Sequence, residues 1–236
     1  MNADRTDQKG YAKRLRVLVI APSLDILGGQ AVQAARLVTR LRELPLFEIG
    51  FLPINPRLPG PFRSLQAIKY LRTVVTSLRY LATLIARVPS YDVIHIFSAS
   101  YFSFVLAQTP AILLAKLFGR KVLLNYHSGE AEDHLTRWRT AAPLIRMADA
   151  VAVPSEYLAR VFAKFGIQAR AINNLIELER FTFRERRPLR PMFLANRNLE
   201  KHYGVDHVLR AFALIQKHVP DAELILAGDG DRKSVV

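Results

Sequence analysis

The chain has 236 residues, of which 50% are hydrophobic and 23% are charged, a composition typical of a folded globular protein rather than a disordered or fibrous one. It contains no cysteine, which excludes disulfide bonds, thiolate metal sites and cysteine nucleophiles. The formal charge of +14 favours anionic partners, but no basic run carries the aromatic residues or signatures of nucleic-acid binders, so we expect no nucleic-acid partner.

The amino-terminal residues 1–13 form a polar, basic segment without the apolar core of a signal peptide. We therefore expect a tail ahead of the first folded element, no export by that route, and a cytoplasmic location. The absence of cysteine agrees with a reducing compartment.

Strand and helix patterns alternate through residues 14–181. Arg14–Ala21 ends in an apolar, β-branched run that predicts a buried strand, and a loop closing on Gly28 and Gly29 precedes a helical pattern in Gln30–Leu44. Further strands are predicted in Phe47–Ile54, Val93–Ser98, Lys121–His127 and Ala150–Pro154. Alternating strands and helices predict crossover units, hence an α/β fold with a Rossmann-like parallel sheet.

A long helix is predicted from about Ser64 to Arg87. Its apolar residues form one stripe and basic residues lie elsewhere around it; the stripe contains Leu65, Ile68, Leu71, Val74, Val75, Leu78, Leu81 and Ile85. We expect this stripe to pack on the sheet. A peripheral contact with an anionic membrane stays open as the alternative, because basic amphipathic helices bind such surfaces.

The apolar stretch Tyr101–Phe118 is shorter than the roughly 20 apolar residues of a membrane span and contains polar residues. It is interpreted as a buried crossover helix.

A second, shorter unit follows a charged, proline-bearing linker at residues 182–191. In residues 192–230 the patterns predict a strand at Met192–Ala195, a helix at His202–His218 and a strand at Glu223–Ala227. Because two strands and one helix do not make a complete Rossmann lobe, we expect the incomplete start of a second Rossmann-like domain.

Four segments, in this order, resemble the retaining glycosyltransferases of the family-4 type. They are the Gly28-Gly29 loop, Asp92–His95 with Asn125–His127, Asn174–Phe181, and Asn196–Gly204 running on to Gly228-Asp-Gly230. The resemblance implies a GT-B fold, in which an acceptor-side domain precedes a nucleotide-sugar-binding domain. It also implies transfer of a hexose from a nucleotide-sugar donor to a glycan, lipid-linked or small-molecule acceptor, with no cofactor beyond the donor and no metal.

Three candidate sites follow from this resemblance. Gly28 and Gly29 are expected to approach the donor's sugar and phosphate, since glycine permits close backbone approach and a helix N-terminus favours negative charge; an ordinary strand-to-helix turn is the alternative. His127, at the end of a predicted strand, is implied in the acceptor and transfer site, with a structural histidine as the alternative. Arg197 and Lys201 match the cations that grip the donor diphosphate, or else are solvated loop charges.

Nearby titratable residues are expected to be structural. His95 lies inside a predicted strand and is assigned to the core, and Glu130, Glu132 and Asp133 are expected to begin a helix, where carboxylates favour the dipole.

The chain departs from the family pattern in several places. Leu175 stands where the family has glycine, and His202 and Tyr203 separate Lys201 from Gly204. No Glu-x7-Glu stretch, which completes the family's donor site, follows Gly230, so we expect this fragment to be inactive. Residues 231–236 read like a translated sequencing adapter and are expected to be a non-native tail.

Two other functions stay open at this point: a non-catalytic module that binds a sugar or a partner, and a sugar-nucleotide epimerase of related architecture. The matches at Asn174–Phe181 and Arg197–Lys201 favour transfer.

Overall fold

The computed structural model describes residues 14–25, 28–56 and 69–230. The chain divides into two compact units, residues 1–176 and 177–236.

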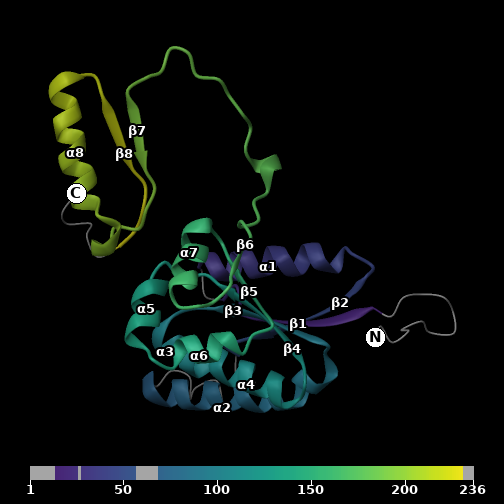
Figure 1. Cartoon of the computed structure of the whole chain (residues 1–236). Helices are drawn as coiled ribbons and strands as arrows, with labels where there is room; N and C mark the ends of the chain where they lie inside the picture. The colour runs from purple at the N-terminus through teal and green to yellow at the C-terminus, as the bar shows by residue number, and fades with distance from the viewer. Residues whose placement is uncertain (1–13, 26–27, 57–68, 231–236) are drawn as a thin grey trace. The chain divides into compact units, whose positions relative to one another are not determined.

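The first unit is built on a six-stranded sheet in which every pairing is parallel (Figure 1). The strand order is β2-β1-β3-β4-β5-β6. The strands are β1 (Leu15–Ala21), β2 (Phe47–Pro53), β3 (Val93–Ser98), β4 (Lys121–Tyr126), β5 (Ala150–Val153) and β6 (Arg170–Ala171). The predicted α/β fold with a Rossmann-like parallel sheet is therefore confirmed. The two-residue β6 had no pattern in the sequence from which it could be predicted.

Helices cover both faces of this sheet. The helix α1 (Gly29–Arg42) packs on one face, where its Ala34 and Val38 meet β1. The other face carries α2 (Lys69–Arg87), α3 (Tyr101–Ser103), a π-helical turn (Phe104–Gln108), α4 (Thr109–Leu117), α5 (Ala131–Arg137), α6 (Ala141–Arg146) and α7 (Glu156–Lys164). Right-handed crossovers place helices on opposite faces when successive strands are added in opposite directions.

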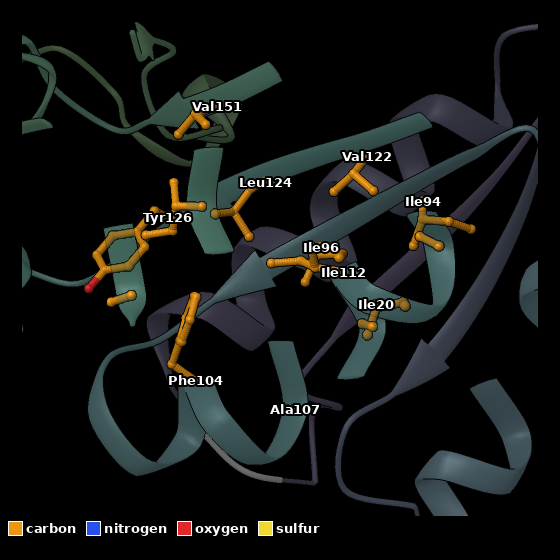
Figure 2. Close-up of a cluster of buried hydrophobic side chains, with 14 of the residues drawn as sticks. Ile20, Ile94, Ile96, Phe104, Ala107, Ile112, Val122, Leu124, Tyr126 and Val151 are labelled. Atoms are coloured by element: carbon orange, nitrogen blue, oxygen red, sulfur yellow. The ribbon is translucent and has the colours of Figure 1, made fainter. Parts of the chain in front are cut away.

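The central strand β1 shows why the sheet is buried on both sides. Side chains alternate between faces along a strand. Leu18 and Ile20 are fully buried in the larger core, whereas Val17 and Val19 pack on the α1 side. Figure 2 shows the larger core, with isoleucines of β1 and β3 beside residues of β4 and the helical layer. The continuous apolar run of β1 is thus the signature of a strand covered on both faces.

Helix α2 lies with its apolar stripe outward, so the prediction that the stripe packs on the sheet was wrong. Leu71, Val74, Leu78, Leu81 and Ile85 are 36% to 62% exposed. The core contacts come instead from two residues on another side of the helix, Tyr80 and Leu84, which are almost completely buried. Within the stripe Val75 is half-buried, and the predicted members Leu65 and Ile68 lie outside the described residues.

The segment Tyr101–Leu117 is helical, as predicted, but it is buried along one side only. Its inward residues include Phe104, Ala111 and Ile112, while Phe102 and Leu117 are well exposed. Across the part of the chain that the structure describes, no helix is both long enough and apolar enough to cross a membrane.

Two charged contacts hold the amino ends of the strands. The Arg16 Nη2 atom lies 3.0 Å from Asp92 Oδ1, and the Arg16 backbone N–H donates to Asp92 Oδ2, which joins β1 to β3. Asp149 accepts from Lys116, Lys121 and the backbone N–H of Val122. Burial raises the pKa of Asp149, but these hydrogen bonds outweigh it and hold the pKa well below its ordinary value.

The second unit contains β7 (Met192–Ala195), a 3-10 turn (Lys201–Tyr203), α8 (Val205–His218) and β8 (Glu223–Leu226), with β7 parallel to β8. The helix was predicted from His202, but it begins at Val205. The reason is Gly204, whose φ of +66° is left-handed and ends the 3-10 turn before α8 starts.

Replacing Asp149 with asparagine is expected to lower the free energy of unfolding at neutral pH by about 1–2 kcal/mol, because three hydrogen bonds to a partly buried carboxylate are weakened. Since the folded pKa is lowered, this difference should shrink as the pH falls below about 4. Urea unfolding at several pH values measures both effects.

The matched control is Glu132→Gln, which breaks the exposed pair of Glu132 with Lys164. This variant should lower the free energy of unfolding by less than about 1 kcal/mol. Equal losses for the two variants would contradict the role assigned to Asp149.

Candidate functional site

A pocket of about 790 Å³ opens at the carboxyl ends of β1, β2 and β3. The strands β2 and β3 lie on opposite sides of β1, so the strand order reverses direction at β1. The carboxyl ends of these strands form the topological switch point, which is where open parallel sheets bind ligands. The pocket is lined by Pro22, Gly28, Gly29, Gln30, Ala31, Ile54, Asn55, Pro56, Arg72, Thr73, Thr76, Ser77, Tyr80, Ala99, Ser103, Leu106 and Ala107. Hydroxyl, amide and guanidinium groups on an otherwise apolar wall suit a polar ligand.

Gly28 and Gly29 lie at this pocket, at the start of α1. Gly28 is extended, with a φ of −177°, so its backbone does not demand glycine. A Cβ built on either residue meets no described atom within 4 Å. The described residues supply α1 with no side-chain cap, and its first turn carries no acidic residue. No described side chain therefore neutralises the positive end of the helix dipole, which favours an anion.

Gln30 ties this helix terminus to two neighbouring strands. Its Nε2 donates to the backbone oxygen of Ser98 at 3.2 Å and to that of His127 at 3.3 Å. These residues end β3 and follow β4, so one side chain joins the carboxyl ends of both strands to α1. Gln30 was not predicted as a site residue, because nothing in a helical pattern indicates contacts with residues so far along the chain.

His127 directly follows β4, at the carboxyl edge of the sheet. Its ring stacks on Phe97, with centroids 5.2 Å apart. Burial lowers the pKa of His127, so the ring is neutral near pH 7 and one nitrogen can accept a proton. It shares this edge with Gly28 and Gly29.

His95 belongs to the core, as the sequence analysis expected. It is 7% exposed and stacks on the opposite side of Phe97, and its Nε2 has no hydrogen-bond partner among the described residues. Burial, with a smaller effect from His127, lowers the pKa of His95 to about 4.

A second polar group lies beside His127. Ser100 Oγ and Ser128 Oγ are 2.5 Å apart, and the Tyr101 hydroxyl donates to Asp133 Oδ2 at 2.5 Å. This last hydrogen bond raises the pKa of Tyr101 to about 12. Tyr101 also has a φ of +55°, an uncommon conformation for a residue with a side chain. These residues were not predicted as a group from the sequence, since they come together only where β3 and β4 end.

The acidic residues after His127 begin α5, as predicted. Glu130 precedes the helix, while Glu132 and Asp133 lie in its first turn. Their carboxylates favour the positive helix end.

In the second unit, Arg197 and Lys201 lie between β7 and α8. The Arg197 guanidinium lies 5.7 Å from the centre of the Tyr203 ring. A Cβ on Gly228 would lie 2.1 Å from the Arg197 oxygen, and one on Gly230 would lie 2.4 Å from the Leu199 oxygen. Glycine is therefore required at both positions, because the two loops touch through their backbones.

Leu175, which replaces a glycine of the family pattern, is held by α1. Its backbone exchanges two hydrogen bonds with the Gln33 amide and accepts a third from Arg36. A side chain is tolerated here because the contact is made by the backbone.

The first unit is thus a Rossmann-like domain with a pocket at its switch point, beside a helix terminus that favours an anion. The family model described as Glycosyltransferase Family 4 matches residues 9–180, well over half of the chain, so the chain belongs to this family. A search of curated proteins gives no match. The matched domain is of the glycosyltransferase type, which in general implies a sugar donor and an acceptor.

The stability of the chain should fall as the pH falls from 6.5 toward about 4, because the unfolded chain protonates His95 more readily than the folded chain does. One such histidine contributes at most about 1.4 kcal/mol per pH unit. In His95→Leu, the contribution of His95 to the decrease in the free energy of unfolding with falling pH should disappear. Urea unfolding between these pH values measures it.

His127 and His134 have pKa values lowered in the same direction, so the slope of the variant should be reduced rather than abolished. The control is His218→Leu, at the exposed end of α8 in the other unit. An unchanged slope in His95→Leu would show that His95 is not kept neutral by the fold.

Proposed function

We propose that the protein containing this chain transfers a hexose from a nucleotide-sugar donor to a glycan, lipid-linked or small-molecule acceptor, with retention of anomeric configuration. The observation that carries the proposal is the pocket beneath an uncapped α1 terminus in a domain that belongs to a glycosyltransferase family. The proposed architecture is of the GT-B type, with an acceptor-side first domain and a donor-binding second domain.

The open space around Gly28 and Gly29 lets the sugar and phosphate of the donor approach the backbone. The N–H groups of the first turn of α1 have no partner in their own helix, and they stabilise phosphate charge. His127, kept neutral by burial, is proposed to contact the acceptor and to hold or accept a proton during transfer.

Arg197 and Lys201 are proposed to bind the donor diphosphate. A guanidinium provides a fork of donors and an ammonium a compact charge. The tight backbone contacts of Gly228 and Gly230 support this assignment, because they fix the loop that carries Arg197. We propose no metal or further cofactor, a cytoplasmic location, and a peripheral contact with the inner face of an anionic membrane.

The chain should bind at least one nucleotide sugar, and Gly28→Ala should weaken that binding by about tenfold by filling the space near the donor. Saturation-transfer NMR with UDP-, GDP-, ADP- and dTDP-sugars measures the binding. Arg197→Gln should weaken it to a similar extent, whereas neither variant should lower the unfolding midpoint by more than a few degrees.

Ala163→Val, which adds bulk at an exposed position of α7 away from the pocket, is the matched control. If none of the nucleotide sugars binds, the proposed function fails and a non-catalytic module that binds another partner takes its place.

The purified 236-residue chain should release no nucleotide from a bound donor above the rate in buffer. The reason is that no Asp or Glu is among the residues that line the pocket, so the described residues supply it with no carboxylate to stabilise the positive charge that develops during glycosyl transfer. Nucleotide release followed by chromatography checks this, and measurable turnover would contradict it. If a bound sugar nucleotide changes its sugar configuration without transfer, the reaction is epimerisation instead.

A further inference from the structure

The exposed stripe of α2 covers a narrow arc of the helix. At about 100° per residue, Leu71, Val74, Leu78, Leu81 and Ile85 fall within an arc of about 80°. All five are at least 36% exposed, and the described helix is about 28 Å long, at about 1.5 Å per residue. Contiguous apolar surface of this kind on a folded protein marks an interaction site.

Among the described residues, the core contacts of α2 do not come from this stripe. Tyr80 and Leu84 make the core contacts of α2, and the Tyr80 hydroxyl donates to the Ala107 oxygen at 2.9 Å. The pocket uses a further set of α2 residues, among them Thr73, Thr76 and Ser77. The helix, which lies along the bottom of the first unit in Figure 1, therefore has one side in the core and the pocket and another side with an exposed apolar stripe.

The charges around the stripe have one sign. The sequence contains no Asp or Glu between Glu48 and Asp92, although six Lys or Arg residues occur there. On α2, Arg79 and Arg72 lie about 80° and 100° around the helix from Leu71, both on the same side of the stripe. Both are exposed. Cations beside an apolar stripe, with no carboxylate on the helix, complement an anionic lipid surface.

We propose that the outward face of α2 docks the first unit on an anionic lipid bilayer. Leu71, Val74, Leu78, Leu81 and Ile85 enter the boundary between headgroups and acyl chains, while Arg79, which is exposed and does not line the pocket, contacts lipid phosphates. A second copy of this chain fits less well, because a two-fold contact through α2 brings like charges together without a carboxylate of the helix to pair them.

This docking also narrows the acceptor class, a step that rests on the proposed function. Because α2 contributes both the docking face and a wall of the pocket, the pocket lies within about one helix diameter, about 10 Å, of the bilayer surface. A lipid-linked acceptor can then keep its chain in the bilayer and place its polar headgroup among the hydroxyls of Thr73, Thr76 and Ser77.

The test is co-sedimentation of the 236-residue chain with phosphatidylcholine vesicles, with and without phosphatidylglycerol. Binding should require the anionic lipid and weaken at high salt. The variant Val74→Gln with Leu78→Gln should lose at least about tenfold in vesicle affinity. Both positions are more than half exposed, so circular dichroism and the unfolding midpoint should stay close to those of the original chain.

Leu46→Gln is the matched control, since Leu46 is 64% exposed and precedes β2 at the amino ends of the strands. It should leave vesicle binding unchanged. Binding that is absent with anionic vesicles, or equal in the original chain and the α2 variant, overturns the proposal. Self-association that the α2 variant abolishes, without vesicle binding, assigns the face to a second copy instead.

The failure of docking and the failure of the proposed function are distinguishable. Vesicle binding needs no sugar nucleotide, and nucleotide-sugar binding needs no vesicle. A chain that binds a nucleotide sugar but no vesicle keeps the transferase proposal and loses the membrane one.

Discussion

The parallel pairing of β1 with both β2 and β3 is the constraint on which the rest of the first unit depends. Right-handed crossovers then place α1 on one face and the remaining helices on the other, and the loops after β1 and β3 part at their carboxyl ends. The opening so formed is the pocket that contains Gly28 and Gly29. The Arg16–Asp92 contact joins β1 and β3 at their amino ends. It therefore helps to fix the register of the two strands whose carboxyl ends border the pocket.

The chemistry of the pocket edge follows from what surrounds each group. The α1 terminus is left without a carboxylate in its first turn, while α5 begins with Glu132 and Asp133. One helix end is therefore available to an anion, and the other is already neutralised by its own chain. His127 stays neutral because burial removes the solvation that its charged form requires.

Helix α2 presents different residues to the core, to the pocket and to the outside of the first unit. Tyr80 and Leu84 pack in the core, the hydroxyl residues Thr73, Thr76 and Ser77 line the pocket, and the large apolar residues face outward. An amphipathic helix normally buries its widest apolar face. Here a tyrosine and a leucine suffice for the core contact, because α4 already supplies Ala111 and Ile112 to the same cluster. The outward stripe is the face that we propose to dock on an anionic bilayer.

The sequence by itself determined the α/β class, five of the six strands of the first sheet and the helices α1, α2, α4 and α5, since short-range periodicity reflects which faces are buried. It also placed Gly28 and Gly29 at the loop before the first helix, His127 at the end of a strand, and His95 in the core. The tertiary structure alone decided that Gln30 joins Ser98 and His127, 68 and 97 residues away, and that Tyr101 meets Asp133. It also decided the direction of the α2 stripe, because periodicity shows that a helix has one apolar face but not what that face meets; that depends on side chains which only the folded sheet and its neighbouring helices bring together.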